Sequence, residues 1–344
     1  MSASGPSAPT KRINLALQGG GAHGAFTWGV LDRLLEDERI DIEGICGTSA
    51  GAMNAVALAH GMTEGGAAGA RETLDRFWRG VGETARFSPI WRSPLDRLLG
   101  TWRLDHSPTY LAFDVLTRML SPYQTNPFNY HPLERVLEDV VDFAVVRRCT
   151  AVKLFICATN VRTGKIKVFA TEEVCPEAIL ASACLPFLFQ AVEYDGEHYW
   201  DGGYMGNPAI YPLIYRCDSP DVMIVQINPL YRETVPDTAR EIMDRVNEIS
   251  FNSSLMREMR AIAFVGRLVE EGKLDRRAYK RMNIHLLEAD AKLKPLGASS
   301  KLNAEPAFLE HLKAIGRDAC DRWLARNFDQ IGVNSTVDLV ATYL

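Results

Sequence analysis

The sequence predicts an α/β fold with a mostly parallel central sheet flanked by helices. Two short apolar runs, at 13–17 and 42–46, each lead into a glycine-containing turn and then into a segment of helical periodicity. This order of strand, turn and helix is typical of a parallel sheet. Further apolar runs of strand length follow at 152–157, 166–169 and 222–227, so the alternation continues along the chain.

The first unit combines a buried strand, a run of glycines and a helix. Residues 13–17 lead directly into Gly19, Gly20 and Gly21, and apolar residues then recur at helical spacing over 26–35. Consecutive glycines at a strand-to-helix junction leave backbone N–H groups uncovered, and these groups can bind an anion.

The glycine loop can be compared with two nucleotide-binding motifs, the dinucleotide motif and the P-loop. Gly19, Gly21 and Gly24 satisfy G-x-G-x-x-G, but a dinucleotide site also needs an acidic residue at the end of the second strand. The acids Asp41 and Glu43 stand at the beginning of that strand instead. A P-loop would need Gly-Lys-Ser or Gly-Lys-Thr after the glycines, and neither follows them. The remaining functional interpretation is an oxyanion hole that faces the next turn.

The second unit ends in Gly47-Thr48-Ser49-Ala50-Gly51, which matches G-x-S-x-G and precedes a helical segment at 50–60. This context predicts a nucleophile elbow, a sharp turn that requires glycine on both sides of the serine. Ser49 would then project its hydroxyl at the carboxyl end of the sheet, near the positive end of the helix dipole. The pentapeptide alone is equally compatible with an ordinary helix start that Ser49 caps.

The third feature is Asp201-Gly202-Gly203, far downstream. An isolated Asp-Gly indicates only a turn, so the functional interpretation of this motif depends on its combination with the glycine loop and the elbow. A glycine-rich loop, an elbow and an Asp-Gly-Gly in this chain order resemble the patatin-like phospholipase family, as does the stretch 181–189, which begins with Ala-Ser and contains Pro-Phe. The resemblance covers about residues 13–230.

The resemblance implies a patatin-like three-layer architecture and a dyad of serine and aspartate without histidine. It makes Ser49 the nucleophile, Asp201 the general base and Gly19, Gly20 and Gly21 the oxyanion-hole loop, with His23, Gly24, Gly47, Gly51, Gly202 and Gly203 in supporting positions. His23 departs from the family, which usually carries arginine or lysine there. A fixed positive charge is thereby replaced by a group that we expect to titrate near neutral pH.

The residues around Asp201 are consistent with its role as the base of such a dyad. A serine hydroxyl needs a base whose pKa lies near the operating pH, and a solvated aspartate, near ~3.9, is too acidic. The apolar surroundings of Tyr199, Trp200 and Tyr204 are expected to raise the pKa of Asp201 by desolvation. Asp201 would then also activate the water that hydrolyses the acyl-enzyme.

The competing Ser-His-Asp arrangement finds no well-placed histidine. His285 lies in a predicted strand and His311 in a predicted amphipathic helix, and both are expected to be structural. His198 is expected to neighbour the site at most. The remaining histidines form no spaced pair and the cysteines no C-x-x-C, so neither a metal nor a cofactor is expected.

Composition indicates a soluble enzyme with a large core. The chain has 344 residues, 47% of them hydrophobic, and its net charge of −5 argues against a nucleic-acid partner. Seven scattered cysteines fit reduced thiols in a cytoplasm. No apolar stretch reaches the ~20 residues of a spanning helix, so any membrane contact is expected to be peripheral. The oligomeric state stays open.

The domain organisation follows from these features. We expect a disordered leader at 1–12, a catalytic domain at 13–230, and a mostly helical C-terminal elaboration at 231–344 packed on the same domain. The glycine-rich segment 61–69 is predicted to be a loop or a helix start. An insertion at 86–130 is rich in aromatic residues and arginines, which suits a lipid interface, but we expect a cap that buries its aromatics against the sheet.

The expected activity is hydrolysis of ester bonds in phospholipids or related lipids through an acyl-enzyme. Two alternatives stay open. One is an esterase or thioesterase for soluble acyl compounds, and the other is a catalytically silent scaffold that binds lipid.

Overall fold

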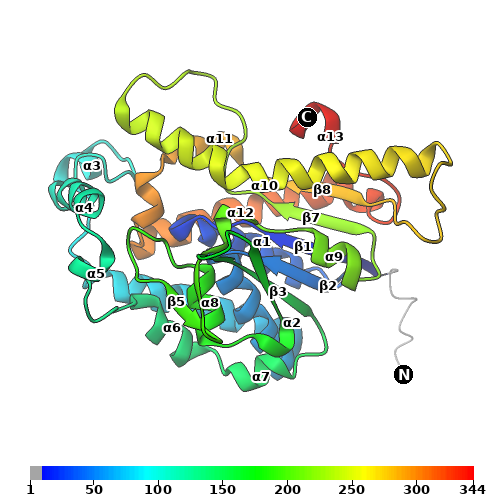
Figure 1. The fold of residues 1–344 in the computed structure, drawn as a ribbon, viewed down its shortest axis with the longest axis horizontal. Helices are drawn as coiled ribbons and strands as arrows, with labels where there is room; N and C mark the ends of the chain where they lie inside the picture. The colour runs from blue at the N-terminus through cyan, green and yellow to red at the C-terminus, as the bar shows by residue number, and fades with distance from the viewer. Residues whose placement is uncertain (1–9) are drawn as a thin grey trace, which may run out of the picture.

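The computed structural model describes residues 10–344, and its centre is a mixed eight-stranded sheet (Figure 1). The strands are β1 (Lys11–Leu17), β2 (Ile40–Gly47), β3 (Lys153–Asn160), β4 (Ile166–Ala170), β5 (Val192–Tyr194), β6 (Glu197–Asp201), β7 (Asp221–Val225) and β8 (Asn283–Leu287). Their order is β5-β6-β3-β2-β1-β7-β8, with β4 also paired to β3. The pairs from β3 through β2, β1 and β7 to β8 are parallel, whereas β4 and β6 pair antiparallel with β3. The predicted mostly parallel sheet is confirmed, and the run at 166–169 is an antiparallel strand.

Helices cover both faces of the sheet and complete three layers (Figure 1). One face carries α1 (Gly24–Glu36), α2 (Ala50–Ala85), α8 (Pro176–Ser182) and α12 (Pro306–Asn327), and the other carries α9 (Tyr211–Arg216), α10 (Ala239–Glu270) and α13 (Leu339–Tyr343). Side chains of β1 alternate between the two cores: Leu15 and Leu17 join the first, and Ala16 joins the second. The β1 end that leads into the glycine loop is therefore enclosed from both sides.

The glycine-rich segment 61–69 is not a loop but contains the start of a second helical stretch of α2, which is the other alternative that the sequence predicts. α2 departs from helical geometry only at Gly65 and Gly66, where φ is −150° and 61°. A Cβ on Gly61 would lie 2.3 Å from the carbonyl oxygen of Gly69, so the glycines allow the two halves of α2 to pack against each other. The glycines of this segment therefore produce a kink in α2 and allow a close contact between its two halves.

The two ends of the chain bear on the predicted boundaries. Residues 1–9 of the leader predicted at 1–12 lie outside the described residues. The last two residues of that range already belong to β1, which begins at Lys11. The region 231–344 contributes β8 to the same sheet, α10 to one face and α12 to the other. Within residues 10–344, no helix combines the length and apolarity needed to cross a bilayer.

The aromatic-rich insertion forms small helices at one end of the molecule (Figure 1): α3 (Pro94–Leu98), α4 (Pro108–Met119) and α5 (Pro122–Thr125). The expectation of a cap that buries its aromatics is wrong for most of them. Trp102 stacks on Phe308 and Tyr110 is buried, but the other large apolar side chains are mainly exposed. We call the exposed set the apolar end: Phe87, Trp91, Leu95, Leu98, Leu99, Leu111, Val115, Leu116, Met119, Leu120, Tyr123, Phe128 and Tyr130.

Candidate active site

Ser49 lies in a sharp turn between β2 and α2. Its backbone has φ 55° and ψ −122°, a region that residues other than glycine rarely adopt. A Cβ on Gly51 would lie 2.2 Å from the carbonyl oxygen of Leu17, and one on Gly47 would lie 2.7 Å from that of Gly51. Both elbow glycines are therefore needed for close backbone approach, as the sequence predicts. The Ser49 N–H donates to the Ser182 hydroxyl at 2.9 Å, which ties the elbow to the end of α8.

Asp201 ends β6 beside this turn. Its N–H donates to the carbonyl oxygen of Cys184 at 2.8 Å, and its Oδ1 accepts the N–H of Gly203 at 2.7 Å. The side chain is buried, and desolvation raises the pKa of Asp201 to about 7, although hydrogen bonds from Gly203 and from the Ser49 side chain pull it down. No cation among the described residues contributes to this pKa. The predicted rise of the pKa by desolvation is confirmed.

The glycine loop lies directly against the elbow. A Cβ on Gly19 would lie 2.8 Å from the Cβ of Ser49, and Gly21 has a φ of 58°, where glycine is favoured. The N–H of Gly19 donates to Oδ1 of Asn207 at 2.7 Å, so this N–H is not free for an oxyanion. Within residues 10–344, the N–H groups of Gly20 and Gly21 donate to no protein acceptor. Two of the three expected loop glycines therefore keep free donors.

The remaining supporting glycines are close-contact positions. A Cβ on Gly24 would lie 2.5 Å from the Cβ of Ala50, at the start of the elbow helix. A Cβ on Gly202 would lie 2.1 Å from the carbonyl oxygen of Cys157, and one on Gly203 would lie 2.0 Å from the Phe251 ring. These glycines let α1, β3 and α10 pack tightly around the two reacting side chains.

A buried polar network holds the glycine loop from behind. Oε1 of Gln18 accepts the N–H groups of Ile227 and Asn228, each at 2.9 Å. The Asn228 amide donates to the carbonyl oxygen of Gly19 at 2.8 Å, and Nζ of Lys301 donates to Oδ1 of Asn228 at 2.7 Å. Burial lowers the pKa of Lys301. The sequence analysis missed this network, because its members are brought together from three distant parts of the chain.

Two further supports were also missed, although both lie in stretches that the motifs include. Ser182 is the second residue of the Ala-Ser segment at 181–189, and Asn207 follows the Asp-Gly-Gly motif by four residues. Asn207 is buried, and its Nδ2 has no partner among the described residues. Asn207 thus fixes the glycine loop through its oxygen and keeps an amide donor unused.

His23 does not carry a titratable charge at neutral pH. Its ring is buried at the start of α1, with Nε2 2.7 Å from the Ser300 hydroxyl and its edge against Phe308. Burial, with a smaller contribution from Lys301, lowers the pKa of His23 to about 3. The expectation that His23 titrates near neutral pH is therefore wrong, because the C-terminal region covers it.

Within residues 10–344, no hydrogen bond joins a histidine to Ser49 or Asp201. His285 has Nε2 2.9 Å from Oδ1 of Asp221 and is buried, and His311 stacks on the Trp102 ring. His198 lies on β6 an odd number of residues from Asp201, so it points to the opposite face of the strand. In the described part of the chain, no group of three or more His, Cys, Asp or Glu side chains is placed to hold a metal ion.

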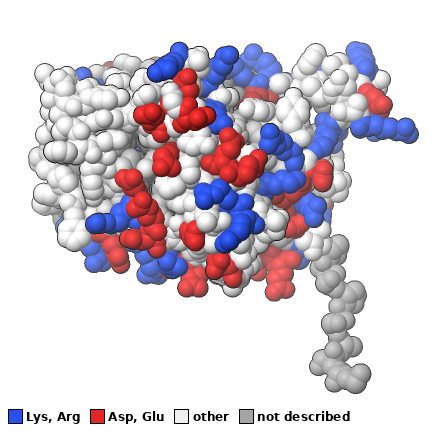
Figure 2. All heavy atoms as spheres, turned by 60° about the horizontal axis from the view of Figure 1, so that its bottom comes forward, with Lys and Arg blue, Asp and Glu red and all other residues white. Residues whose placement is uncertain are grey.

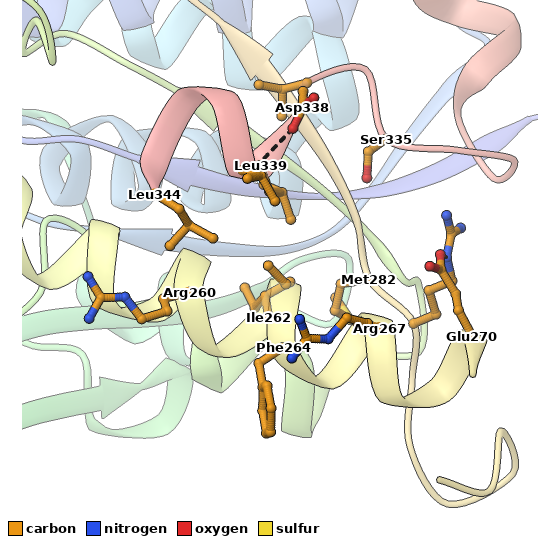
Figure 3. Close-up of a pocket in the computed structure, with 15 residues that line it drawn as sticks. Arg260, Ile262, Phe264, Arg267, Glu270, Met282, Ser335, Asp338, Leu339 and Leu344 are labelled. Carbon is orange, nitrogen blue, oxygen red and sulfur yellow. Dashed lines mark hydrogen bonds and ion pairs between the residues drawn. The ribbon is translucent and has the colours of Figure 1, made fainter. Parts of the chain in front are cut away.

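A cavity of about 630 Å³ lies away from Ser49 and Asp201, between the end of α10, β8 and α13 (Figure 3). Figure 3 shows Ile262 of α10 and Leu344, which follows α13, on its facing sides. Arg260 and Arg267 also line it. None of its lining residues belongs to the elbow, the glycine loop or the Asp-Gly-Gly segment, so this cavity is separate from the candidate active site.

Comparison with known proteins identifies a family for this arrangement. A family model described as patatin-like phospholipase matches residues 15–214. The search among curated proteins found no match. Two of the similar solved structures are VipD from Legionella pneumophila and the type III effector ExoU, whose complex with SpcU comes from Pseudomonas aeruginosa. VipD is 16% identical with a TM-score of 0.42, covering 93% of this chain and 68% of its own. ExoU is 16% identical with a TM-score of 0.35, covering 92% of this chain and 54% of its own.

Proposed function

The chain belongs to the patatin-like phospholipase family and is a lipid acyl hydrolase, and we propose that it cleaves ester bonds of phospholipids through Ser49 and Asp201. The observation that carries this proposal is the contact of the Ser49 side chain with a buried carboxylate whose pKa is about 7. A base with such a pKa can accept a proton during the attack and return it later at neutral pH.

The proposed reaction has two balanced steps. Ser49 Oγ attacks the ester carbonyl carbon while Asp201 takes the hydroxyl proton, and the N–H groups of Gly20 and Gly21 stabilise the oxyanion. The bond to the alcohol oxygen then breaks, Asp201 returns the proton to that oxygen, and the acyl group stays on Ser49. Water repeats the sequence on the acyl-enzyme, and releases the fatty acid and free Ser49.

The strained elbow supports this assignment of the nucleophile. A serine held at φ 55° costs of order 1–3 kcal/mol, and such strain persists where the surrounding structure imposes it for function. The N–H bond to Ser182 and the tight fit of Gly51 impose it here.

The test is hydrolysis of a p-nitrophenyl ester and of dispersed phospholipid by wild type, Ser49→Ala and Asp201→Asn. Both variants are expected to lose turnover by about 10⁴-fold or more while staying folded by circular dichroism. His198→Ala is the matched control and is expected to retain most activity. Substantial turnover by Ser49→Ala, or a loss in His198→Ala as large as in Asp201→Asn, would overturn the proposal.

A further inference from the structure

The apolar end exposes many large hydrophobic side chains. The side chains of Phe87, Leu98, Met119 and Phe128 are 91%, 84%, 77% and 94% exposed. Figure 2 shows the matching end of the molecule almost without charged side chains, whereas acids and bases are interspersed over the rest of the visible face. Large contiguous apolar patches on a protein surface mark interaction sites.

The helices of the apolar end turn their apolar faces outward. On α4 the exposed residues Leu111, Val115, Leu116 and Met119 follow helical spacing and form one stripe. Between residues 106 and 130 the only charged residues are Asp114 and Arg118, which pair with each other at 3.0 Å. This stripe has the composition of a helix face that meets an apolar medium.

Buried polar contacts also fix the inner side of the same segment. Asp96 is buried and accepts hydrogen bonds from Ser93, and His106 lies 2.7 Å from it. Arg92 pairs with Glu305 of the C-terminal region at 2.6 Å. The segment thus buries polar groups such as Asp96 while most of its leucines are exposed, which is the reverse of what folding in water favours.

Charge and ring chemistry favour a lipid surface as the occupant. Residues 87–130 carry four arginines and three aspartates, with no lysine or glutamate, in a chain whose net charge is −5. Trp91, Tyr123 and Tyr130 are exposed beside the aliphatic side chains, and such rings prefer the headgroup depth of a bilayer. An apolar end with little net charge and with exposed aromatic rings suits the interface of a bilayer, while the charged remainder of the protein stays in water.

Contacts connect the apolar end to the candidate active site. Nε2 of Gln190 donates to the carbonyl oxygen of Asn126 at 2.8 Å, next to α5. The Cys184 sulfur donates to the carbonyl oxygen of Gln190 at 3.1 Å, and the Cys184 carbonyl oxygen accepts the N–H of Asp201. Phe187, in the same loop, is 65% exposed. A bilayer that covers the apolar end would therefore lie beside the loop that adjoins the dyad.

We propose that the apolar end is a docking surface that enters the headgroup and upper acyl region of a phospholipid bilayer and presents its lipids to the active site. This inference rests on the proposed function for its second half only, because docking itself needs no catalysis. A second copy of the chain is the competing occupant, and the experiment below distinguishes it.

The test measures docking and catalysis separately. Ser49→Ala protein is sedimented with vesicles of phosphatidylcholine and phosphatidylglycerol, with and without the added pair Leu116→Gln and Met119→Gln. Glutamine keeps helix propensity at these exposed positions, and the pair is expected to weaken binding by about tenfold or more. The matched control pair is Val333→Gln and Val340→Gln, two exposed apolar residues outside the apolar end, and it is expected to bind normally.

Activity assays complete the design. With Ser49 present, the Leu116→Gln and Met119→Gln pair is expected to hydrolyse a soluble ester at the wild-type rate and vesicle phospholipid about tenfold more slowly. Unchanged vesicle binding by this pair would overturn the inference. A dimer in solution that the same pair dissolves would also overturn it, in favour of a second copy. If vesicle binding depends on the apolar end but the wild type hydrolyses no ester, the proposed function would be refuted and the docking inference would stand.

Discussion

Replacing Asp201 by asparagine is expected to stabilise the fold above about pH 7 while it removes the proposed base. Burial raises the pKa of Asp201 to about 7 in the folded state, whereas an unfolded aspartate titrates near ~3.9. Between these two values the folded protein binds more protons than the unfolded one, so its stability falls as the pH rises. Each pKa unit corresponds to ~1.4 kcal/mol, so ionised Asp201 costs the fold up to about 4 kcal/mol above pH 7.

The assay is urea unfolding of wild type and Asp201→Asn at about pH 4 and about pH 8. The difference in unfolding free energy between the two proteins is expected to be small at the lower pH and to favour Asp201→Asn at the higher pH. Asp195→Asn is the matched control, since Asp195 is exposed in the turn between β5 and β6. A difference that does not change between the two pH values would refute the burial argument.

The remaining predictions concern the supports of the site. Because the pKa of His23 is about 3, its ring is neutral at neutral pH, and His23→Gln is expected to leave both limbs of the pH profile of kcat/KM in place. A shift of the alkaline limb in this variant would contradict the prediction. Gly51→Ala puts a methyl group 2.2 Å from the Leu17 carbonyl oxygen and is expected to lower the unfolding free energy by ~1–3 kcal/mol or more in urea titrations; wild-type stability would refute the elbow geometry. Lys301→Met removes the donor to Asn228 and is expected to lower kcat about tenfold at constant KM, with partial recovery in Lys301→Arg. An unchanged kcat would show that the glycine loop does not need this network.

Local patterns in the sequence predicted the elbow and the strand, turn and helix units around it. The turn at Ser49 follows from adjacent residues, because only glycines at 47 and 51 tolerate the close backbone approach. The rise of the Asp201 pKa was also predictable, since the neighbouring residues of β6 are aromatic and carry no cation. Both features depend on chemistry within a few residues of the motif.

The features that sequence analysis missed depend on distant contacts. The N–H of Gly19 is taken by Asn207, and His23 is buried by Ser300 and Phe308, far along the chain. Periodicity identifies a strand at 166–169 but not its antiparallel direction, which is set by pairing with β3. The aromatic residues of 86–130 were expected to be buried against the sheet, but most are exposed, because composition specifies that a segment is apolar and not what covers it.

The central claim, that Asp201 activates Ser49 without a histidine, is tested most directly by the pH dependence of Ser49 labelling with a fluorophosphonate. The account predicts one adduct, located on Ser49 by peptide mapping, with a labelling rate that falls as the pH drops through about 7, because protonated Asp201 cannot accept the hydroxyl proton. Asp201→Asn should be labelled more slowly by ~10³-fold or more at every pH. An adduct on another serine, or undiminished labelling of Asp201→Asn, would contradict the account.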